Sequence, residues 1–141
     1  MDTRGILEQK LAYILQTNPF MQHLGIQFIK LEPGNLVGTF QYDKKLLNPY
    51  GSMHGGVLYS IADIITGFAA CSFGTMASTI DGSMNYLSPV QEEGTYTCEA
   101  IMVRQGKQVS VYKAEIRDEK KKLYATGTFT FYMLKEDLLH H

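Results

Sequence analysis

The chain has 141 residues, of which 45% are hydrophobic and 19% are charged, a composition typical of a globular protein and not of a disordered one. Its formal net charge is −1, and its basic side chains form only short runs, such as Lys120 to Lys122, that suit a solvated loop. Nucleic-acid binding is therefore excluded as the main function, because phosphate recognition needs a concentrated basic surface.

The N-terminal third predicts one helix and two strands. In residues 3 to 17 the apolar side chains recur every three or four positions, which places them on one face of a short helix: Leu7, Leu11, Ile14 and Leu15. Asn18-Pro19 is expected to end this helix, since the residue before a proline disfavours the helical conformation. Residues 25 to 31 and 36 to 42 read as strands, with a turn at residues 32 to 35 between them.

The remaining sequence predicts one very apolar helix, at about residues 55 to 73, and four more strands. The strand-like runs are rich in Val, Ile, Thr, Tyr and Phe and lie at about 78 to 87, 95 to 105, 108 to 118 and 123 to 133. Because a helix that is apolar nearly all round must be covered on all sides, we expect an antiparallel sheet to curl around it. The fold class is therefore α+β, and residues 1 to 141 are expected to form a single domain.

Two features bear on the compartment of the protein. The N-terminal segment lacks the long apolar stretch of a signal peptide, and the longest apolar run is too short and too interrupted to span a bilayer. Cys71 and Cys98 have neither a paired nor a metal-ligand spacing, so they are expected to be free thiols of a reducing compartment. The sequence therefore predicts a cytoplasmic protein with no membrane insertion and no metal site. The terminal His140-His141 pair, native or a tag remnant, carries no weight here.

The segment "HGG" at residues 54 to 56 lies where the apolar helix is expected to start. Glycines let a backbone approach a ligand closely, and the first N–H groups of a helix have no partner within it and lie at the positive end of its dipole. Such an N–H group can stabilise the oxyanion that forms when a carbonyl is attacked. The alternative is that Gly55 and Gly56 only allow tight packing where a loop enters a helix.

Asp63 is a carboxylate in the middle of the apolar helix, where an unpaired charge is costly. Together with Ser60, Thr66 and Gly67 it recurs at spacings of three and four, so these residues line one narrow polar stripe. This pattern favours a carboxylate that faces a cleft and acts as a base or a nucleophile. A core aspartate held by a neighbouring hydroxyl or by strand amides is the alternative.

Eight residues separate Gly55 from Asp63, which is roughly 12 Å along a helix. One reacting carbonyl cannot contact both within ~3 Å. In a two-fold dimer with antiparallel central helices, however, the start of one helix lies near the middle of the other, and two identical sites form at the interface. We therefore expect a homodimer in which Asp63 serves the site of its partner.

The spacing of Asn48, His54-Gly55-Gly56 and Asp63 resembles that of the hot-dog-fold thioesterases of the phenylacetate-pathway type, close to their thioesterase-superfamily-member-2 branch. The segments "STIDGSMNYLSP" (78 to 89) and "RQGKQVSVYKAEI" (104 to 116) are similar to the strand after the helix and to a later hairpin of that family. The resemblance implies a hot-dog fold, in which a curved antiparallel sheet of about six strands wraps the central helix. It also implies an acyl-CoA thioesterase that needs no cofactor.

The resemblance implies a role for each catalytic candidate. Asp63 is expected to activate the hydrolytic water or to attack the thioester itself, and the Gly55 N–H to hold the oxyanion. Asn48 would orient the thioester carbonyl or the water, and Thr79 would help to hold the water near Asp63. Asn48 and Gly55 are expected to come from one subunit, and Asp63 and Thr79 from the other. Asn48 is also a common turn residue and Thr79 a common strand residue, so a structural role for either stays open.

Four further residues are candidates for substrate binding: His54, Gly56, Gly106 and Lys107. His54 is expected to shape the loop and not to act as an acid or base. Gly106 and Lys107 would meet the phosphates or the pantetheine of CoA, unless they form a solvated hairpin tip. Ser88 stands where the family frequently has a basic residue before the proline. If that basic residue contacts CoA in relatives, the contact is missing here, and the position of the nucleotide end of CoA stays open.

The acyl preference of the enzyme stays open between aromatic and aliphatic groups. Four residues are candidates either for the wall of an acyl tunnel or for plain core: Met53, Phe68, Met76 and Met84. The rival functions are a hot-dog hydratase or dehydratase, whose "HFPG"-like start is absent, and a non-catalytic protein that binds acyl-CoA. Whether dimers pair into a homotetramer is also open.

Overall fold

The computed structural model describes residues 3 to 138, so the His140-His141 pair lies outside the described residues. Two helices precede the sheet: α1 spans Thr3–Thr17 and α2 spans Pro19–Leu24. Asn18-Pro19 ends α1 as predicted, but it also starts α2, which the sequence pattern did not predict. The Asn18 side chain accepts a hydrogen bond from the Met21 N–H (3.1 Å) and Pro19 occupies the first turn, so the signal that stops one helix also starts the next.

The remaining elements are one long helix, a short 3₁₀ turn and six strands. After the hairpin of β1 and β2, the 3₁₀ turn at Lys44–Leu46 leads towards α3 at Gly55–Cys71. The strands are β1 (Gln27–Glu32), β2 (Asn35–Gln41), β3 (Thr75–Tyr86), β4 (Thr95–Arg104), β5 (Val109–Arg117) and β6 (Leu123–Asp137). They form one antiparallel sheet in the order β1-β2-β4-β5-β6-β3.

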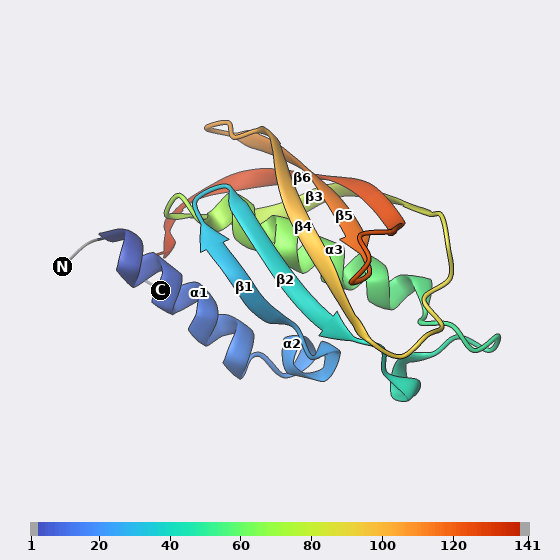
Figure 1. Ribbon diagram of the computed structural model, residues 1–141. Coiled ribbons are helices and arrows are strands. Elements are labelled where there is room, and N and C mark those ends of the chain that lie inside the picture. The colour runs from blue at the N-terminus through green and yellow to red at the C-terminus, as the bar shows by residue number, and fades with distance from the viewer. Residues whose placement is uncertain (1–2, 139–141) are drawn as a thin grey trace.

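The sheet curves around α3, which lies lengthwise against its inner face, while α1 lies beside β1 (Figure 1). The predicted α+β class, with an N-terminal helix, a long central helix and six antiparallel strands, is confirmed. The main differences are at strand ends: β3 begins at Thr75 and β6 continues to Asp137, and these two residues pair with each other. Pairing between residues so far apart in the chain leaves no local sequence pattern.

The core lies between α3 and the sheet. From α3 it receives Leu58, Ile61, Ala62, Ile65, Phe68 and Ala69, and from the sheet Phe40, Tyr112, Ile116, Phe129 and Phe131. Burying a side chain of the size of Leu or Phe stabilises the fold by about 1.5–3 kcal/mol. Strand β2 approaches α3 so closely that a Cβ at Gly38 would lie 2.5 Å from Ile65 Cδ1, so a larger residue there would force Ile65 to shift.

One face of α3 is not covered by the chain itself. Gly56 is exposed, and Ser60, Asp63, Ile64 and Gly67 are only half-buried. The expectation that the chain covers this helix on all sides is therefore wrong, because a single sheet packs against only one side of it. None of the helices within residues 3 to 138 has both the length and the apolar character needed to cross a bilayer.

Candidate active site

The N-terminal end of α3 leaves one N–H group available to a ligand. His54 is the N-cap, and its Nδ1 accepts a hydrogen bond from the Gly56 N–H (2.9 Å). The Gly55 N–H has no acceptor among the described residues, since it lies in the first turn of the helix. Of the two predicted glycines, Gly55 therefore carries the free donor, whereas Gly56 is occupied by the side chain of His54.

Asn48 is fixed by the loop that precedes this helix. Its Oδ1 accepts hydrogen bonds from the N–H groups of Tyr50 (2.9 Å) and Ser52 (3.1 Å), which also identifies its other terminal atom as the NH₂ group. Nδ2 donates to the Ser52 hydroxyl (3.3 Å), and its second hydrogen has no acceptor among residues 3 to 138. Asn48 is thus a turn residue through its oxygen and a rigidly held donor through its nitrogen.

Asn48 and Gly55 line the same cavity, whose volume is about 260 Å³. Its apolar wall includes Met53 and Leu58, and no charged side chain lines it. Tyr86, from the end of β3, borders the cavity and donates its hydroxyl hydrogen to the Gly55 carbonyl oxygen (2.7 Å). Two residues with a free donor hydrogen, Asn48 in its side chain and Gly55 in its backbone, thus line one mostly apolar cavity.

Asp63 lies two turns further along α3 and contacts β3. The Thr79 hydroxyl donates to Asp63 Oδ1 (2.7 Å), and Oδ2 accepts no hydrogen bond from the described part of the chain. Burial raises the pKa of the Asp63 carboxyl, and the hydrogen bond from Thr79 opposes that rise. The structure therefore brings these two candidates together and leaves one carboxylate oxygen available.

The predicted polar stripe of Ser60, Asp63, Thr66 and Gly67 is only partly exposed in the structure. Thr66 is completely buried, and its hydroxyl donates to the Ala62 carbonyl (2.7 Å). The Ser60 hydroxyl likewise donates to the Gly56 carbonyl (2.8 Å). Both hydroxyls donate to backbone carbonyls of their own helix, as Ser and Thr commonly do. Among the predicted stripe residues, only Asp63 therefore forms a side-chain hydrogen bond with another element.

Within one chain the two pairs of residues stay apart. Asn48 and Gly55 lie at the start of α3, whereas Asp63 lies roughly 12 Å further along the same helix. Lys107 and Gly106 lie further still, because the Gln105 amide of the β4–β5 hairpin donates to the Ala70 carbonyl near the end of α3 (3.1 Å). The chain therefore places two separate pairs of candidate residues and a hairpin tip along one helix.

Sequence reasoning missed Ser52 and Tyr86. The Ser52 contact is local, and the four-residue spacing from Asn48 could have indicated a closed turn. Tyr86 lies 31 residues from Gly55, so its bond depends on where β3 packs and has no sequence signal. Of the candidate acyl-wall residues, Met53 lines the cavity, while Phe68 packs in the core with its ring 5.5 Å from that of Phe28.

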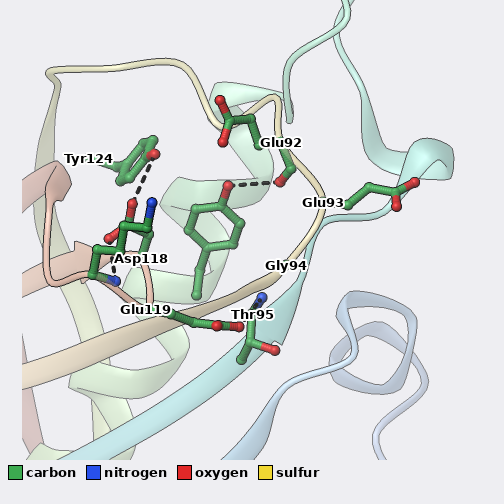
Figure 2. A pocket seen from close by; sticks show the side chains of 9 residues that line it. Glu92, Glu93, Gly94, Thr95, Asp118, Glu119 and Tyr124 are labelled. Atoms are coloured by element: carbon green, nitrogen blue, oxygen red, sulfur yellow. Dashed lines mark hydrogen bonds between the residues drawn. The ribbon is translucent and has the colours of Figure 1, made fainter.

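A second cavity, of about 180 Å³, lies beside the loops that precede β4 and follow β5 (Figure 2). Two of its carboxylates are used inside the fold: Asp118 accepts from the Tyr124 hydroxyl (3.2 Å) and Glu119 from the Thr95 N–H (3.2 Å). Its acidic lining also disfavours an anionic ligand. Among the described residues, no group of three His, Cys, Asp or Glu side chains is arranged to hold a metal ion. We therefore place the candidate site at α3.

Comparisons with known proteins agree on one family. The profile of the thioesterase superfamily matches residues 50 to 125. Acyl-coenzyme A thioesterase PaaI of Escherichia coli (strain K12) is 35% identical over 102 residues, which cover 72% of this chain and 73% of that protein. The structure of the E. coli PaaI protein from the phenylacetic acid degradation operon has a TM-score of 0.89 and 27% identity, over 96% of this chain and 99% of that one. The structure of smu.793 from Streptococcus mutans UA159 bound to acetyl CoA has a TM-score of 0.75 and 28% identity, over 77% and 88%.

Proposed function

Since this chain belongs to the thioesterase superfamily and has the hot-dog fold of a PaaI-like thioester hydrolase, we propose that it hydrolyses acyl-CoA to a free acid and CoA. The family resemblance seen in Asn48, the HGG segment and Asp63 is thereby confirmed. Two relatives support the acyl-CoA substrate: the E. coli relative is named an acyl-CoA thioesterase, and the S. mutans protein binds acetyl CoA.

The donors at the start of α3 hold the thioester oxygen in this proposal. Gly55 and Asn48 line the same cavity, and in this proposal the Gly55 N–H and the free hydrogen of Asn48 Nδ2 converge on one carbonyl oxygen. A fixed donor of this kind is typically worth ~3–4 kcal/mol of transition-state stabilisation, because it needs no reorganisation when charge develops. His54 keeps the Gly56 N–H away from the substrate and so has a structural role.

Asp63 supplies the base or the nucleophile. As a base it takes a proton from water while the water oxygen bonds to the thioester carbon, and the carbonyl electrons move onto the held oxygen. When this intermediate collapses, the C–S bond breaks and the CoA thiolate receives the proton from Asp63. As a nucleophile, Asp63 would instead bond to the thioester carbon and expel CoA as its thiolate. Water would then hydrolyse the resulting anhydride, which frees the acid, restores the Asp63 carboxylate and releases the proton that the thiolate takes up. Thr79 orients the carboxylate in either route.

A dimer brings the two pairs of candidate residues, the half-sites, together, and two open surfaces favour one. The uncovered face of α3 carries Asp63, and β3 is a twelve-residue edge strand. Ile80 of this strand and Leu87, the residue that follows it, are more than half exposed. An exposed edge strand is a template for pairing with another chain. Covering both surfaces with a second copy would remove apolar area from water and complete the sheet.

One two-fold axis fits both surfaces. Tyr59 lies midway between Gly55 and Asp63 on α3, and its hydroxyl lies against Gly82, which is close to midway between Thr79 and Tyr86 on β3. An axis near this contact would place Asp63 beside the partner's Gly55 and, at the same time, Thr79 beside the partner's Tyr86. The Thr79–Asp63 and Tyr86–Gly55 hydrogen bonds tie the two elements together, so a single axis near their midpoints favours a site shared by two subunits. A further pairing of dimers into a tetramer remains an expectation.

The hairpin tip fits the same arrangement. Gly106 and Lys107 follow Gln105, which is bound to Ala70 beyond Asp63 on α3. In an antiparallel pair this end of α3 lies towards the partner's Asn48 loop, where the CoA part of the substrate would leave the site. Lys107 is exposed there and can meet a phosphate. We therefore retain both residues as the proposed contacts to CoA.

Both cysteines, Cys71 and Cys98, are free thiols. Burial raises the pKa of the Cys71 thiol to about 11 and that of Cys98 to about 12, so neither is a reactive thiolate near neutral pH. Free structural thiols are typical of a reducing compartment, which supports the proposed cytoplasmic location. Neither cysteine takes part in the proposed chemistry.

The observation that carries this proposal is the free Gly55 N–H beside the held Asn48 amide in one cavity. Its test is a panel of aliphatic and aromatic acyl-CoAs, with released CoA measured by a thiol reagent. We expect rapid release for a subset of acyl groups, and a 10²–10⁴-fold lower rate for Asp63→Asn, which keeps the acceptor for Thr79 but cannot take a proton. Acyl-CoA binding without release would instead favour a binding protein and refute the hydrolase.

A further inference from the structure

The peptide group between Gly55 and Gly56 is held at both ends by side chains. The Tyr86 hydroxyl donates to the Gly55 carbonyl oxygen (2.7 Å), and the Gly56 N–H donates to His54 Nδ1 (2.9 Å). His54 belongs to the loop before α3, whereas Tyr86 is the last residue of β3. One peptide plane is therefore fixed by two different parts of the fold.

These two hydrogen bonds restrict a part of the helix that would otherwise be flexible. Two consecutive glycines have more backbone freedom than any other pair, and the first turn of a helix lacks internal partners for its N–H groups. An oxyanion donor, however, is effective only if it is aimed before the reaction begins. Fixing the carbonyl of Gly55 restricts rotation next to its Cα, and the free N–H of Gly55 is attached to that same Cα.

Tyr86 also lies so close that a side chain at residue 55 would crowd it. A Cβ on Gly55 would lie 3.3 Å from Tyr86 Cζ and 3.5 Å from its hydroxyl oxygen, tighter than or at the limit of ordinary contact. A larger residue would push the phenol away from the carbonyl that it holds. Burial raises the pKa of Tyr86, and the nearby Tyr59 adds to the rise, so the hydroxyl keeps its proton and remains a donor.

We infer that Tyr86 is a positioning residue of the oxyanion site: its hydroxyl holds the Gly55–Gly56 peptide so that the Gly55 N–H points at the thioester oxygen. This inference rests on the proposed function. It gives β3 two tasks, because Thr79 of this strand orients Asp63 and Tyr86 of the same strand orients Gly55. Neither task requires Tyr86 to touch the reacting atoms.

The test compares Tyr86→Phe with the wild type and with Tyr13→Phe, a matched control on the exposed side of α1. Besides kcat and KM, we would measure the inhibition constants of two CoA ligands. A thioether analogue has no oxyanion, whereas a trifluoromethyl ketone analogue forms a tetrahedral adduct with one. We expect Tyr86→Phe to lower kcat and to weaken the ketone about tenfold each, the effect of one hydrogen bond, with KM and thioether binding changed less than about twofold.

Gly55→Ala gives a second, independent readout. It keeps the N–H of residue 55 but crowds Tyr86, so we expect the same selective loss of ketone binding. Because both substitutions act through one hydrogen bond, the double variant should lose no more ketone affinity than the single variant with the larger loss. Additive losses would mean that the two residues act separately and would overturn the inference.

The outcomes separate this inference from the proposed function. An active wild type together with Tyr86→Phe of unchanged kcat and ketone affinity overturns the role of Tyr86 alone. Equal weakening of the thioether and the ketone also overturns it, since Tyr86 would then only shape the cavity. A wild type that hydrolyses none of the acyl-CoAs would refute the proposed function, and the inference would fall with it.

Discussion

Two inactive variants of this protein should restore each other when they share a dimer. Asp63→Asn retains the Oδ1 acceptor for the Thr79 hydroxyl but removes the base. Asn48→Asp retains the Oδ1 acceptor for the Tyr50 and Ser52 N–H groups but replaces the NH₂ donor with a carboxylate oxygen. Each change is nearly isosteric, so each should inactivate one half-site and leave its local structure intact.

The size of the effect follows from the geometry of α3. Because Gly55 and Asp63 lie roughly 12 Å apart on one helix, a site needs Asn48 and Gly55 from one chain and Asp63 and Thr79 from another. An intact site needs its Asn48 from an Asp63→Asn chain and its Asp63 from an Asn48→Asp chain. With equal co-expression each condition holds about half of the time, so about a quarter of the sites are intact, whether or not dimers pair further. Each variant alone should retain about 1% or less, since a base contributes 10²–10⁴-fold and an oxyanion donor about 10²–10³-fold.

The assay measures CoA release by a co-expressed mixture that carries a different affinity tag on each variant. The controls are each variant expressed alone and the wild type carrying both tags. We expect the mixture to reach about a quarter of wild-type activity, at least ~25-fold above either parent. A mixture that stays at the level of its parents, or a wild-type monomer with full activity, would refute the shared site.

Three further predictions concern pH, stability and substrate affinity. Because burial raises the pKa of Asp63, kcat/KM should fall on acidification with a midpoint above the usual aspartate value of about 3.9. The hydrogen bond from Thr79 opposes this rise, so Thr79→Val should move the midpoint to a higher pH. An unchanged midpoint in Thr79→Val would contradict the role of the hydroxyl. The same raised pKa means that ionised Asp63 costs stability above its folded pKa and costs none below the unfolded value. Asp63→Asn should therefore melt at or above the wild-type temperature at pH 7, with the difference shrinking as the pH falls towards 4, whereas a lower melting temperature would favour a structural aspartate. Lys107→Ala should raise KM about two- to fivefold at low salt and leave kcat unchanged, an effect that added salt should remove; an unchanged KM would place CoA elsewhere.

Local features of this chain were readable from the residues alone. The spacing of Leu7, Leu11 and Leu15 predicted α1, and the apolar run after "HGG" predicted α3. The start of α3 was predictable because its cap is made within two residues, by His54 on Gly56. The length of α3 between Gly55 and Asp63 predicted that one chain holds only half of the proposed site, since helical rise depends on residue count alone.

Contacts between distant segments were not readable in the same way. Thr66 was predicted to share a polar stripe with Asp63 but is completely buried, because its burial depends on how the rest of the chain packs around α3. The bond from Tyr86 to Gly55 depends on the register of β3 beside α3, as does the position of β3 at the sheet edge. Register and edge position are settled when all six strands pack together, because a shift of one residue turns every side chain of a strand to the opposite face.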